Sequence, residues 1–361
     1  MKTILITGIT GFIGSALAAK FIEEPDIELI YLTDSETAKN RAITAVNLVL
    51  AEYGMQLDVE RKIKVALCKC LTDVEAIKEC LKELEVDEVW HIAAHMSYDF
   101  SELSESIKFN AVISTNIMSQ LKKCGRYYYI SSTGTAGLGE FNGIEKQVPE
   151  ELLTDFESVN PYTASKVLAE YMLWNESSKT NIPLTILRPG SVIGDSNSGW
   201  VNNTKYGYYS YLHILKRFIN KNMTFYLDID PNKKFPVIHI DHLINLCTFL
   251  RNRKVSKTKM QEIFHACNQN LLTAKEHFLI FEELSVGNLK IGFGEGKEGF
   301  NKVFNTMNKD NNKFLGVNLT YDNSKLIESI GLENIPPPLT KKCLINVFKN
   351  YLEKDRSHAK S

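Results

Sequence analysis

The sequence predicts an α/β protein built on a doubly wound parallel sheet, with a smaller substrate lobe towards the C-terminus. Three observations predict this fold. Short apolar runs alternate with helical stretches in the first half of the chain, the runs lack the polar alternation of half-exposed strands, and a glycine-rich turn joins the first run to the first helical stretch. Strands buried on both faces and separated by helices are typical of a parallel sheet with a layer of helices on each side.

The elements of the first half are predicted from this alternation. The apolar runs, which we expect to be strands, are Thr3–Thr7, Glu28–Thr33, Ile63–Leu67, Glu88–Ala93, Tyr127–Ser131 and Leu184–Leu187. The stretches with helical periodicity are Phe12–Glu23, Glu36–Tyr53, Val74–Leu84, Ser101–Lys123 and Pro161–Ser178. Each connection from one parallel strand to the next should be right-handed.

The regular alternation fades after Arg188. We expect an irregular loop, a helix, a strand and a second helix, in this order: Gly190–Tyr208, Tyr209–Asn220, Pro236–Ile240 and His242–Asn252. The segment Ser285–Val317 is rich in Gly, Asn and Lys and is predicted to be irregular. Three consecutive prolines precede a last helix, Lys341–Glu353, and a frayed tail, Lys354–Ser361. The sheet domain is therefore assigned to 1–188, with 236–252 returning to it, and the lobe to 189–235 and 253–361.

Composition excludes several classes of function. A net charge of -1 does not favour bulk binding to nucleic acid. No apolar run reaches about 18 residues, and no signal peptide precedes the first strand, so no membrane association is expected. The seven cysteines are odd in number and scattered, which indicates reduced thiols in the cytoplasm. They lack the spacing of metal ligands, and no metal site is expected.

The glycine-rich turn indicates a dinucleotide site. Glycines stand at positions 8, 11 and 14, directly after the first strand and at the start of a helix. The first glycine permits a tight turn, the second lets the backbone approach a pyrophosphate, and the third lets the helix pack closely on the strand. The helix N-terminus offers free N–H groups to the anion. We therefore predict that NAD or NADP binds to Gly8, Thr10, Gly11, Phe12, Ile13 and Gly14.

Asp34 follows the second predicted strand and bears on the choice of cofactor. A carboxylate at this place binds ribose hydroxyls and disfavours the extra phosphate of NADP, so it favours NAD. Lys39 and Arg41 lie close in the sequence and offer a phosphate site instead. Asp34 is also a plausible acid at the N-terminus of the next helix.

A tyrosine and a lysine four residues apart carry the predicted chemistry. Asn160 and Pro161 are typical of a helix start, which places Tyr162 and Lys166 on one face of that helix. A free tyrosine has a pKa of about 10, and a neighbouring ammonium lowers it. Tyr162 then becomes able to exchange a proton with a carbonyl or alcohol oxygen.

The fifth predicted strand ends in hydroxyl-bearing residues at the edge of the sheet where ligands bind. We predict that Ser132 hydrogen-bonds the substrate oxygen, with Thr133 as the second candidate. The alternative is a turn serine that binds its own backbone.

Together these residues resemble the extended short-chain dehydrogenase/reductase superfamily, of the epimerase/dehydratase type, with a Rossmann fold. The matching segments are Thr7 to Gly14, His91 to Ala94, Asn110, Ser131-Ser132, Tyr162 to Lys166, Arg188 to Gly190, and Tyr321 to Lys325 with Gly331. The resemblance implies that Asn110 joins the catalytic residues by supporting a water relay behind Lys166, which also reaches the nicotinamide ribose. It implies further cofactor contacts at Leu71, Ala93, Ala94, Pro189 and Val192. Cys70 and Ala136 depart from the superfamily's usual aspartate and tyrosine.

Within the superfamily, Arg188 to Ser196 and Gly199 to Asn202 look like the thioester-reductase-like branch. This resemblance implies reduction of a carbonyl or acyl thioester, held by a small molecule or by a separate carrier, since the chain starts at its first strand. Weaker substrate candidates are Thr133, His95, Trp200 and Asn202. A homodimer is implied by the superfamily alone.

Two alternatives stay open. A nucleotide-sugar epimerase or dehydratase would keep NAD tightly bound and would need basic groups such as Lys205, Lys216 and Arg217 for a diphosphate. A non-catalytic NAD(P)-binding regulator would not need the Ser132, Tyr162 and Lys166 set.

Overall fold

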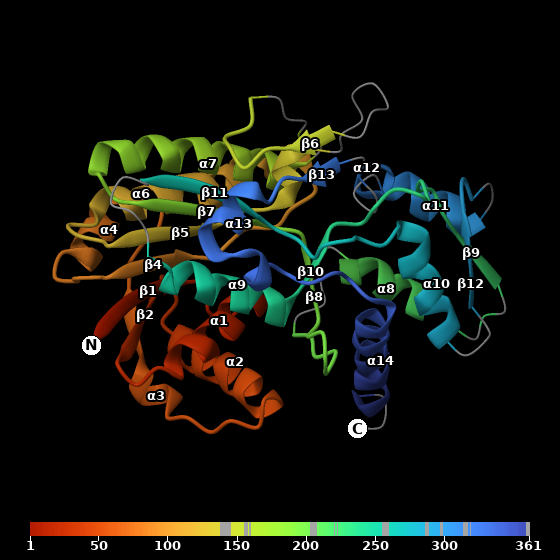
Figure 1. Cartoon of the computed structure of the whole chain (residues 1–361), viewed down its shortest axis with the longest axis horizontal. Helices are drawn as coiled ribbons and strands as arrows, with labels where there is room; N and C mark the ends of the chain where they lie inside the picture. Colours follow the sequence, from red (N-terminus) through yellow and green to blue (C-terminus); the bar gives the residue numbers. More distant parts are fainter. Residues whose placement is uncertain are drawn as a thin grey trace.

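A seven-stranded, fully parallel sheet forms the centre of the larger part of the molecule (Figure 1). The computed structural model describes all residues except 138–145, 155–157, 159, 203–207, 220, 222, 255–259, 286–288, 297–298, 313–316, 318 and 359–361. The strand order is β11-β7-β5-β4-β1-β2-β3. The strands are β1 (Lys2–Thr7), β2 (Ile27–Thr33), β3 (Ile63–Leu67), β4 (Glu88–His91), β5 (Arg126–Ile130), β7 (Leu184–Pro189) and β11 (Gln261–Ala266). This order confirms the predicted doubly wound α/β class.

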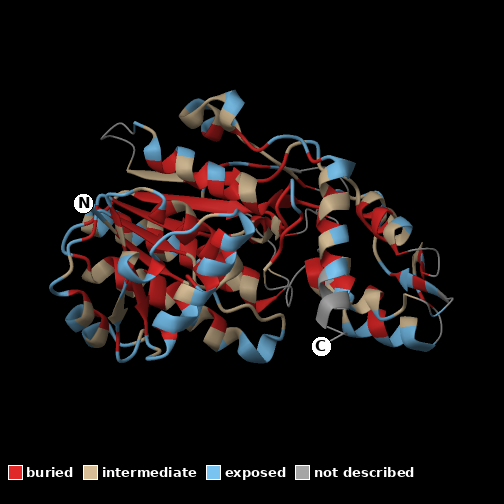
Figure 2. Cartoon of the chain, turned by 90° about the horizontal axis from the view of Figure 1, so that it is seen from below, coloured by how far each residue is buried: buried red, intermediate tan, exposed pale blue. Residues whose placement is uncertain are grey.

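Helices cover both faces of the sheet, because its central strands are apolar on both sides. Ile4 and Ile6 of β1 pack under α1 (Phe12–Ile22), α2 (Ala38–Glu52) and α9 (Ile240–Asn252). Leu5 points to the opposite face, under α4 (Val74–Leu81), α6 (Ile113–Gln120) and α7 (Pro161–Thr180). Figure 2 shows the buried sheet between these layers. A short helix, α3 (Val59–Lys62), precedes β3.

The predicted helix Ser101–Lys123 is interrupted. The structure has a 3-10 turn, η1 (Phe100–Glu102), then α5 (Leu103–Ile107), a π-turn, η2 (Lys108–Val112), and α6. Periodicity alone does not reveal a π-turn, because the extra residue shifts the helical register by only one position.

The smaller part is a lobe with its own aromatic core, at the other end of the molecule (Figure 1). The prediction that Ser285–Val317 is irregular is wrong, because this segment contains β12 (Leu289–Phe293), α11 (Gly299–Met307) and α12 (Lys309–Asn312). Its strand β12 pairs in parallel with the distant β9, a partner that local composition does not show. The lobe elements are α8 (Tyr208–Lys216), β9 (Met223–Leu227), α10 (Ala274–Leu284), β12 (Leu289–Phe293), α11 (Gly299–Met307), α12 (Lys309–Asn312) and α14 (Lys341–His358).

Two small parallel pairs connect the parts. One joins β8 (Ser191–Ile193), inside the predicted loop Gly190–Tyr208, to β10 (Val237–His239). The other joins β6 (Lys146–Val148) to β13 (Leu319–Tyr321), which leads into α13 (Ser324–Ile330) and a 3-10 turn, η6 (Leu332–Asn334).

Two sequence assignments in the C-terminal part need correction. Strand β11 belongs to the main sheet, whereas 253–361 was assigned to the lobe; six consecutive residues of β11 pair with β7. The helix α14 continues to His358, so the tail from Lys354 is helical rather than frayed over most of its length. No helix among the described residues is long and apolar enough to cross a membrane.

Candidate active site

The turn between β1 and α1 requires glycine at two positions. Gly8 has φ +69° and lies so close to β4 that an added Cβ would stand 2.6 Å from the Ala93 nitrogen. A Cβ on Gly14 would stand 2.1 Å from the Gly8 carbonyl oxygen. Gly11 is different, because its nearest neighbour is the same oxygen at 3.3 Å. The first and third glycines therefore shape the turn, and the second leaves its outer side open to a ligand.

The first turn of α1 is free to bind an anion. Gly11 is the N-cap residue and supplies no side-chain hydrogen bond, and no acidic residue lies in the first turn. The N–H groups of Phe12, Ile13 and Gly14 have no hydrogen-bond partner among the described residues. Free N–H groups at a helix N-terminus fit the pyrophosphate of a dinucleotide. Trp200 is buried and packs against Phe12 with ring centroids 5.6 Å apart, so it supports this turn from the lobe side.

The segment after β2 contains both kinds of group that the sequence offered for choosing between NAD and NADP, an acid and a base. Asp34 directly follows the strand and is exposed, and the N-cap residue of α2 is Thr37 rather than Asp34. Arg41 of α2 donates to the Ser35 hydroxyl at 2.9 Å. Leu71, after β3, is half-buried on the same edge of the sheet.

Tyr162 and Lys166 share one face of α7, as predicted from their spacing. The Asn160 side chain caps this helix by accepting from the Thr163 N–H at 2.9 Å. Lys166 is buried and donates from Nζ to the Ile130 carbonyl oxygen at 2.7 Å, while its Nζ lies 5.9 Å from the centre of the Tyr162 ring. The Ser132 side chain lies close enough to the Tyr162 hydroxyl to oppose the rise of the Tyr162 pKa.

The electrostatics of this pair differ from the expectation. Burial lowers the pKa of Lys166 to about 7, and nearby Glu170 opposes that change. Burial raises the pKa of Tyr162 above its usual value, and the nearby Ser132 side chain opposes this only in part. The predicted lowering of the Tyr162 pKa is therefore wrong for this structure, because desolvation of the buried phenol outweighs the effect that lowers it.

Ser132 is a turn serine that also lies beside Tyr162. Its hydroxyl oxygen accepts from the Gly134 N–H at 3.0 Å, as a turn serine does, and it caps the 3-10 turn η3 (Thr133–Ala136). Its side chain still reaches Tyr162. The second candidate, Thr133, is buried, and its side chain lies near Tyr321 of β13. The geometry therefore favours Ser132 as the group that meets a substrate oxygen.

Asn110 lies in the π-turn, and both the oxygen and the nitrogen of its side-chain amide are hydrogen-bonded within the protein. Its amide oxygen accepts from the His95 N–H at 2.7 Å, and its amide nitrogen donates to the His95 carbonyl at 2.9 Å and to the Ser165 hydroxyl at 2.8 Å. These bonds hold the half-buried His95 segment beside the start of α7. The His95 ring packs at a tilt against Phe109, and its Nδ1 lies 3.4 Å from the Ser106 hydroxyl.

The other predicted contacts lie along the carboxyl edge of the sheet. Ala93 and Ala94 follow β4, Pro189 ends β7, and Val192 lies in β8. Asn202 is half-buried at the last described position before 203–207.

A buried charge cluster behind Lys166 was not predicted from the sequence. Glu170 accepts from Arg188 through Nε at 2.9 Å and through a terminal nitrogen at 2.5 Å, and from the Ser131 hydroxyl at 2.5 Å. Both partners of the ion pair are buried. The available signal was the spacing, since Tyr162, Lys166 and Glu170 recur every four residues on one helix face.

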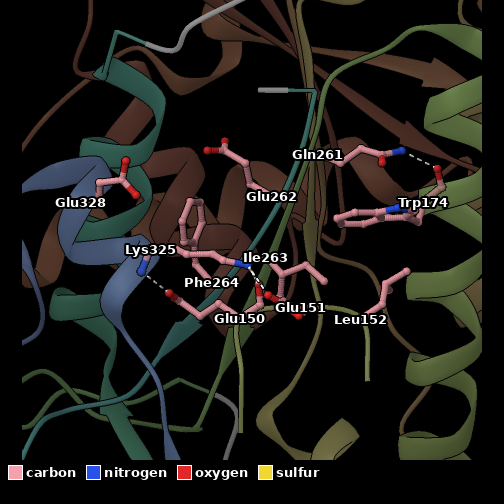
Figure 3. Close-up of a pocket in the computed structure, with 10 residues that line it drawn as sticks. All are labelled: Glu150, Glu151, Leu152, Trp174, Gln261, Glu262, Ile263, Phe264, Lys325 and Glu328. Carbon is pink, nitrogen blue, oxygen red and sulfur yellow. Dashed lines mark hydrogen bonds and ion pairs between the residues drawn. The ribbon is translucent and has the colours of Figure 1, made fainter. Parts of the chain in front are cut away.

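A cavity of about 660 Å³ lies away from this centre, beside the edge strand β11 (Figure 3). Inside it, Glu150 accepts from the N–H groups of Lys325 and Leu326 and of His265, which fixes the start of α13 to the sheet edge. Burial raises the pKa of Glu150 to about 7. Ser132, Tyr162 and Lys166 do not line this cavity. Its lining residues are Glu150, Glu151, Leu152, Trp174, Gln261, Glu262, Ile263, Phe264, Lys325 and Glu328.

The fold, the glycine turn and the buried tyrosine–lysine pair define an NAD(P)-dependent enzyme of the extended short-chain dehydrogenase/reductase type. Residues 6–247 match the family model NAD_binding_4, described as male sterility protein. The match spans more than half of the chain, so the chain belongs to this family, which confirms the thioester-reductase-like resemblance.

Two curated relatives are similar to this chain at low identity. The nonribosomal peptide synthetase asaC of Aspergillus flavus is 26% identical over 253 residues, or 66% of this chain and 24% of that protein. Fatty acyl-CoA reductase 2 of Mus musculus is 25% identical over 309 residues, or 75% of this chain and 58% of that protein. The chain thus spans about a quarter of the first relative and just over half of the second.

Three solved structures share the fold. The terminal R domain of the myxalamid PKS-NRPS pathway has a TM-score of 0.73 at 17% identity, over 99% of this chain and 92% of that one. An archaeal thiolation-reductase di-domain has a TM-score of 0.72 at 18% identity, over 98% and 76%. The NAD complex of UDP-glucuronic acid 4-epimerase from Bacillus cereus has a TM-score of 0.68 at 16% identity, over 98% and 97%.

Proposed function

We propose that this chain reduces acyl thioesters with a nicotinamide cofactor, and that Ser132, Tyr162, Lys166 and Asn110 form its catalytic centre. The observation that carries the proposal is the convergence of Ser132, Tyr162 and Lys166 at the carboxyl edge of the sheet, in a family that includes acyl reductases. Carrier-bound thioesters are supported as a substrate class by the similarity to the thiolation-reductase di-domain.

The roles of the residues follow from their positions. The N-terminus of α1 would hold the pyrophosphate of the cofactor, and Lys166 would serve its nicotinamide ribose. The bound reduced nicotinamide would supply a hydride to the thioester carbon. Ser132 donates a hydrogen bond to the carbonyl oxygen, and Tyr162 gives that oxygen its hydroxyl proton as the negative charge develops. The carbon–sulfur bond then breaks as the new hydroxyl gives up its proton and the departing sulfur takes one, which releases an aldehyde and a thiol.

The test is to incubate the protein with NADH or NADPH and decanoyl-N-acetylcysteamine, while following nicotinamide absorbance, free thiol and aldehyde. Tyr162→Phe should lower kcat by about 100- to 10,000-fold and leave cofactor affinity nearly intact. The matched control is Tyr171→Phe on the same helix, because the Tyr171 hydroxyl donates to the Leu153 carbonyl at 2.6 Å and takes no part in the chemistry. Near-normal turnover by Tyr162→Phe would overturn the assigned role.

A nucleotide-sugar epimerase is less well supported. Lys216 donates to the Tyr351 carbonyl at 3.4 Å and covers that ring, and Arg217 contacts His213 at 2.9 Å, so both serve contacts within the lobe. The third basic candidate, Lys205, lies outside the described residues. Purified protein that retains near-stoichiometric NAD and shows no thioester turnover would favour the epimerase.

For the cofactor, we propose that Asp34 selects NADH. Its exposed carboxylate would repel an added phosphate, although Arg41 lies near enough to attract one. Asp34→Asn should raise the NADPH/NADH ratio of kcat/KM about tenfold, and Arg41→Ala should leave NADH use unchanged. If Asp34→Asn leaves the ratio as it was while Arg41→Ala abolishes NADPH binding, Arg41 sets the preference instead.

A further inference from the structure

Tyr129 contacts two of the four proposed catalytic residues at once. It lies in β5, is fully buried, and points towards the face of the sheet covered by α6 and α7. It is too deep to meet a substrate or cofactor, so any effect on the reaction must pass through its neighbours.

The first contact is between the Tyr129 ring and Lys166. The Lys166 Nζ lies 4.5 Å from the ring centroid, closer than its 5.9 Å from the Tyr162 ring. A cation over an aromatic face is attracted by the ring, and most strongly where water is excluded. The only hydrogen bond of this Nζ among the described residues goes to the Ile130 carbonyl oxygen. The ring therefore supplies the contact that favours the charged amine on the side away from the bulk solvent.

The second contact is between the Tyr129 hydroxyl and the backbone of Asn110. The hydroxyl donates to the Asn110 carbonyl oxygen at 3.1 Å. That carbonyl belongs to the π-turn, where the helical hydrogen bonds are displaced by one residue. A fixed Asn110 backbone keeps its side chain on the His95 backbone, and hence keeps the His95 segment against α7.

We infer that Tyr129 is a positioning residue, whose ring holds Lys166 and whose hydroxyl holds the π-turn of Asn110 in register with it. The inference rests on the proposed roles of Lys166 and Asn110. Tyr129 then has two separate tasks, one for its ring and one for its hydroxyl, and single substitutions can test each of them.

The charge state of Lys166 is set by groups on three elements. Tyr162 and Glu170 lie on its own helix, Tyr129 on β5, and His91 on β4. Burial and the Lys166 charge hold the pKa of His91 at about 3, so His91 stays neutral near pH 7. Loss of the Tyr129 ring should therefore lower the pKa of Lys166 by about one unit, as expected for a desolvated cation–π contact.

The experiment compares Tyr129→Leu, which removes the ring, with Tyr129→Phe, which removes only the hydroxyl. The matched control is Tyr127, two residues earlier on the same strand and face, equally buried, with a hydroxyl that donates to the Ser114 carbonyl at 3.0 Å. The first readout is the titration of the Lys166 side-chain nitrogen by ¹⁵N NMR, with the signal assigned by its loss in Lys166→Met. The second is amide hydrogen exchange at His95.

Tyr129→Leu should move the Lys166 titration down by about one pH unit, whereas Tyr127→Leu should leave it in place. Tyr129→Phe should keep the titration and speed exchange at His95 about tenfold, whereas Tyr127→Phe should not. An unchanged Lys166 titration in Tyr129→Leu, or the same shift in Tyr127→Leu, overturns the first task; unchanged exchange in Tyr129→Phe overturns the second. If Tyr129→Leu does not fold, the Phe variant still decides the second task, and a titration in Tyr129→Met decides the first. Both readouts need no substrate, so they stay valid if thioester turnover is not found.

Discussion

Neutralising Glu170 should destabilise the protein more than any surface charge change. In Glu170→Gln, the Arg188 guanidinium keeps its charge at 0% exposure but loses the carboxylate that accepts two of its nitrogens at 2.9 and 2.5 Å. The amide nitrogen of the substituted side chain also places N–H donors beside the Arg188 guanidinium, which is itself a donor. Breaking a buried ion pair by removing one partner costs about 3–5 kcal/mol, and the Glu151 carbonyl that remains near Arg188 offsets only a part of this. We therefore expect a loss of about 3 kcal/mol.

Urea unfolding, followed by tryptophan fluorescence at pH 7, measures this loss. The control is Glu23→Gln, which removes an ion pair with Lys20 of similar length, 2.7 Å, whose side chains are 39% and 32% exposed; a surface pair contributes about 0–1 kcal/mol. The double variant Glu170→Gln with Arg188→Met should be more stable than Glu170→Gln alone, because no uncompensated charge is left buried. Equal losses in Glu170→Gln and Glu23→Gln would refute the reasoning.

Two further predictions concern the site. Gly14→Ala should lower the free energy of unfolding by more than 2 kcal/mol and abolish cofactor binding, because its Cβ would stand 2.1 Å from the Gly8 oxygen. Gly11→Ala should fold normally and weaken only cofactor binding. Equal stability of the two variants in urea would contradict this. Burial lowers the pKa of Lys166 from 10.5 to about 7. Between pH 7 and pH 10.5 the unfolded chain therefore holds a proton on this lysine that the folded chain has lost, so the stability lost by burying the lysine is largest below pH 7. Lys166→Met should therefore be more stable than the natural protein at pH 6, with an advantage that shrinks as the pH rises to 10, and a pH-independent difference would show that the lysine titrates normally.

The sheet domain was predictable because its signals are local. The central strands are short, mostly apolar runs, since both of their faces are covered, and each helix between them shows its own period. The elements of the lobe lack such signals. Strand β12 finds its partner β9 across a long stretch of sequence, and Phe300 and Phe304 of α11 pack around Phe225 of β9. Those contacts stabilise elements whose composition resembles a loop.

The residues of the site were predictable, but their electrostatics were not. The spacing of Tyr162 and Lys166 on a capped helix fixes their common face. The depth at which that helix lies is a tertiary property, and it is the depth that lowers the lysine pKa and raises the tyrosine pKa. In the same way, the sequence placed Ser132 at a strand end without showing that Thr133 is buried near Tyr321, a residue far along the chain.

The proposed catalytic groups lie where regular structure is broken, and this explains why element prediction and site prediction succeed to different degrees. Gly8 needs a positive φ, Asn110 lies in a π-turn, and Ser132 uses its side chain to end a strand in a 3-10 turn. Each irregularity exposes backbone or side-chain groups that a regular strand or helix would use internally. The helix and strand propensities that predict the scaffold favour regular geometry at these positions. The chain keeps the irregular geometry because buried side chains such as Tyr129, Glu170 and Arg188 form hydrogen bonds at these irregular segments and behind them. The shape of the site therefore depends on the buried polar side chains behind it.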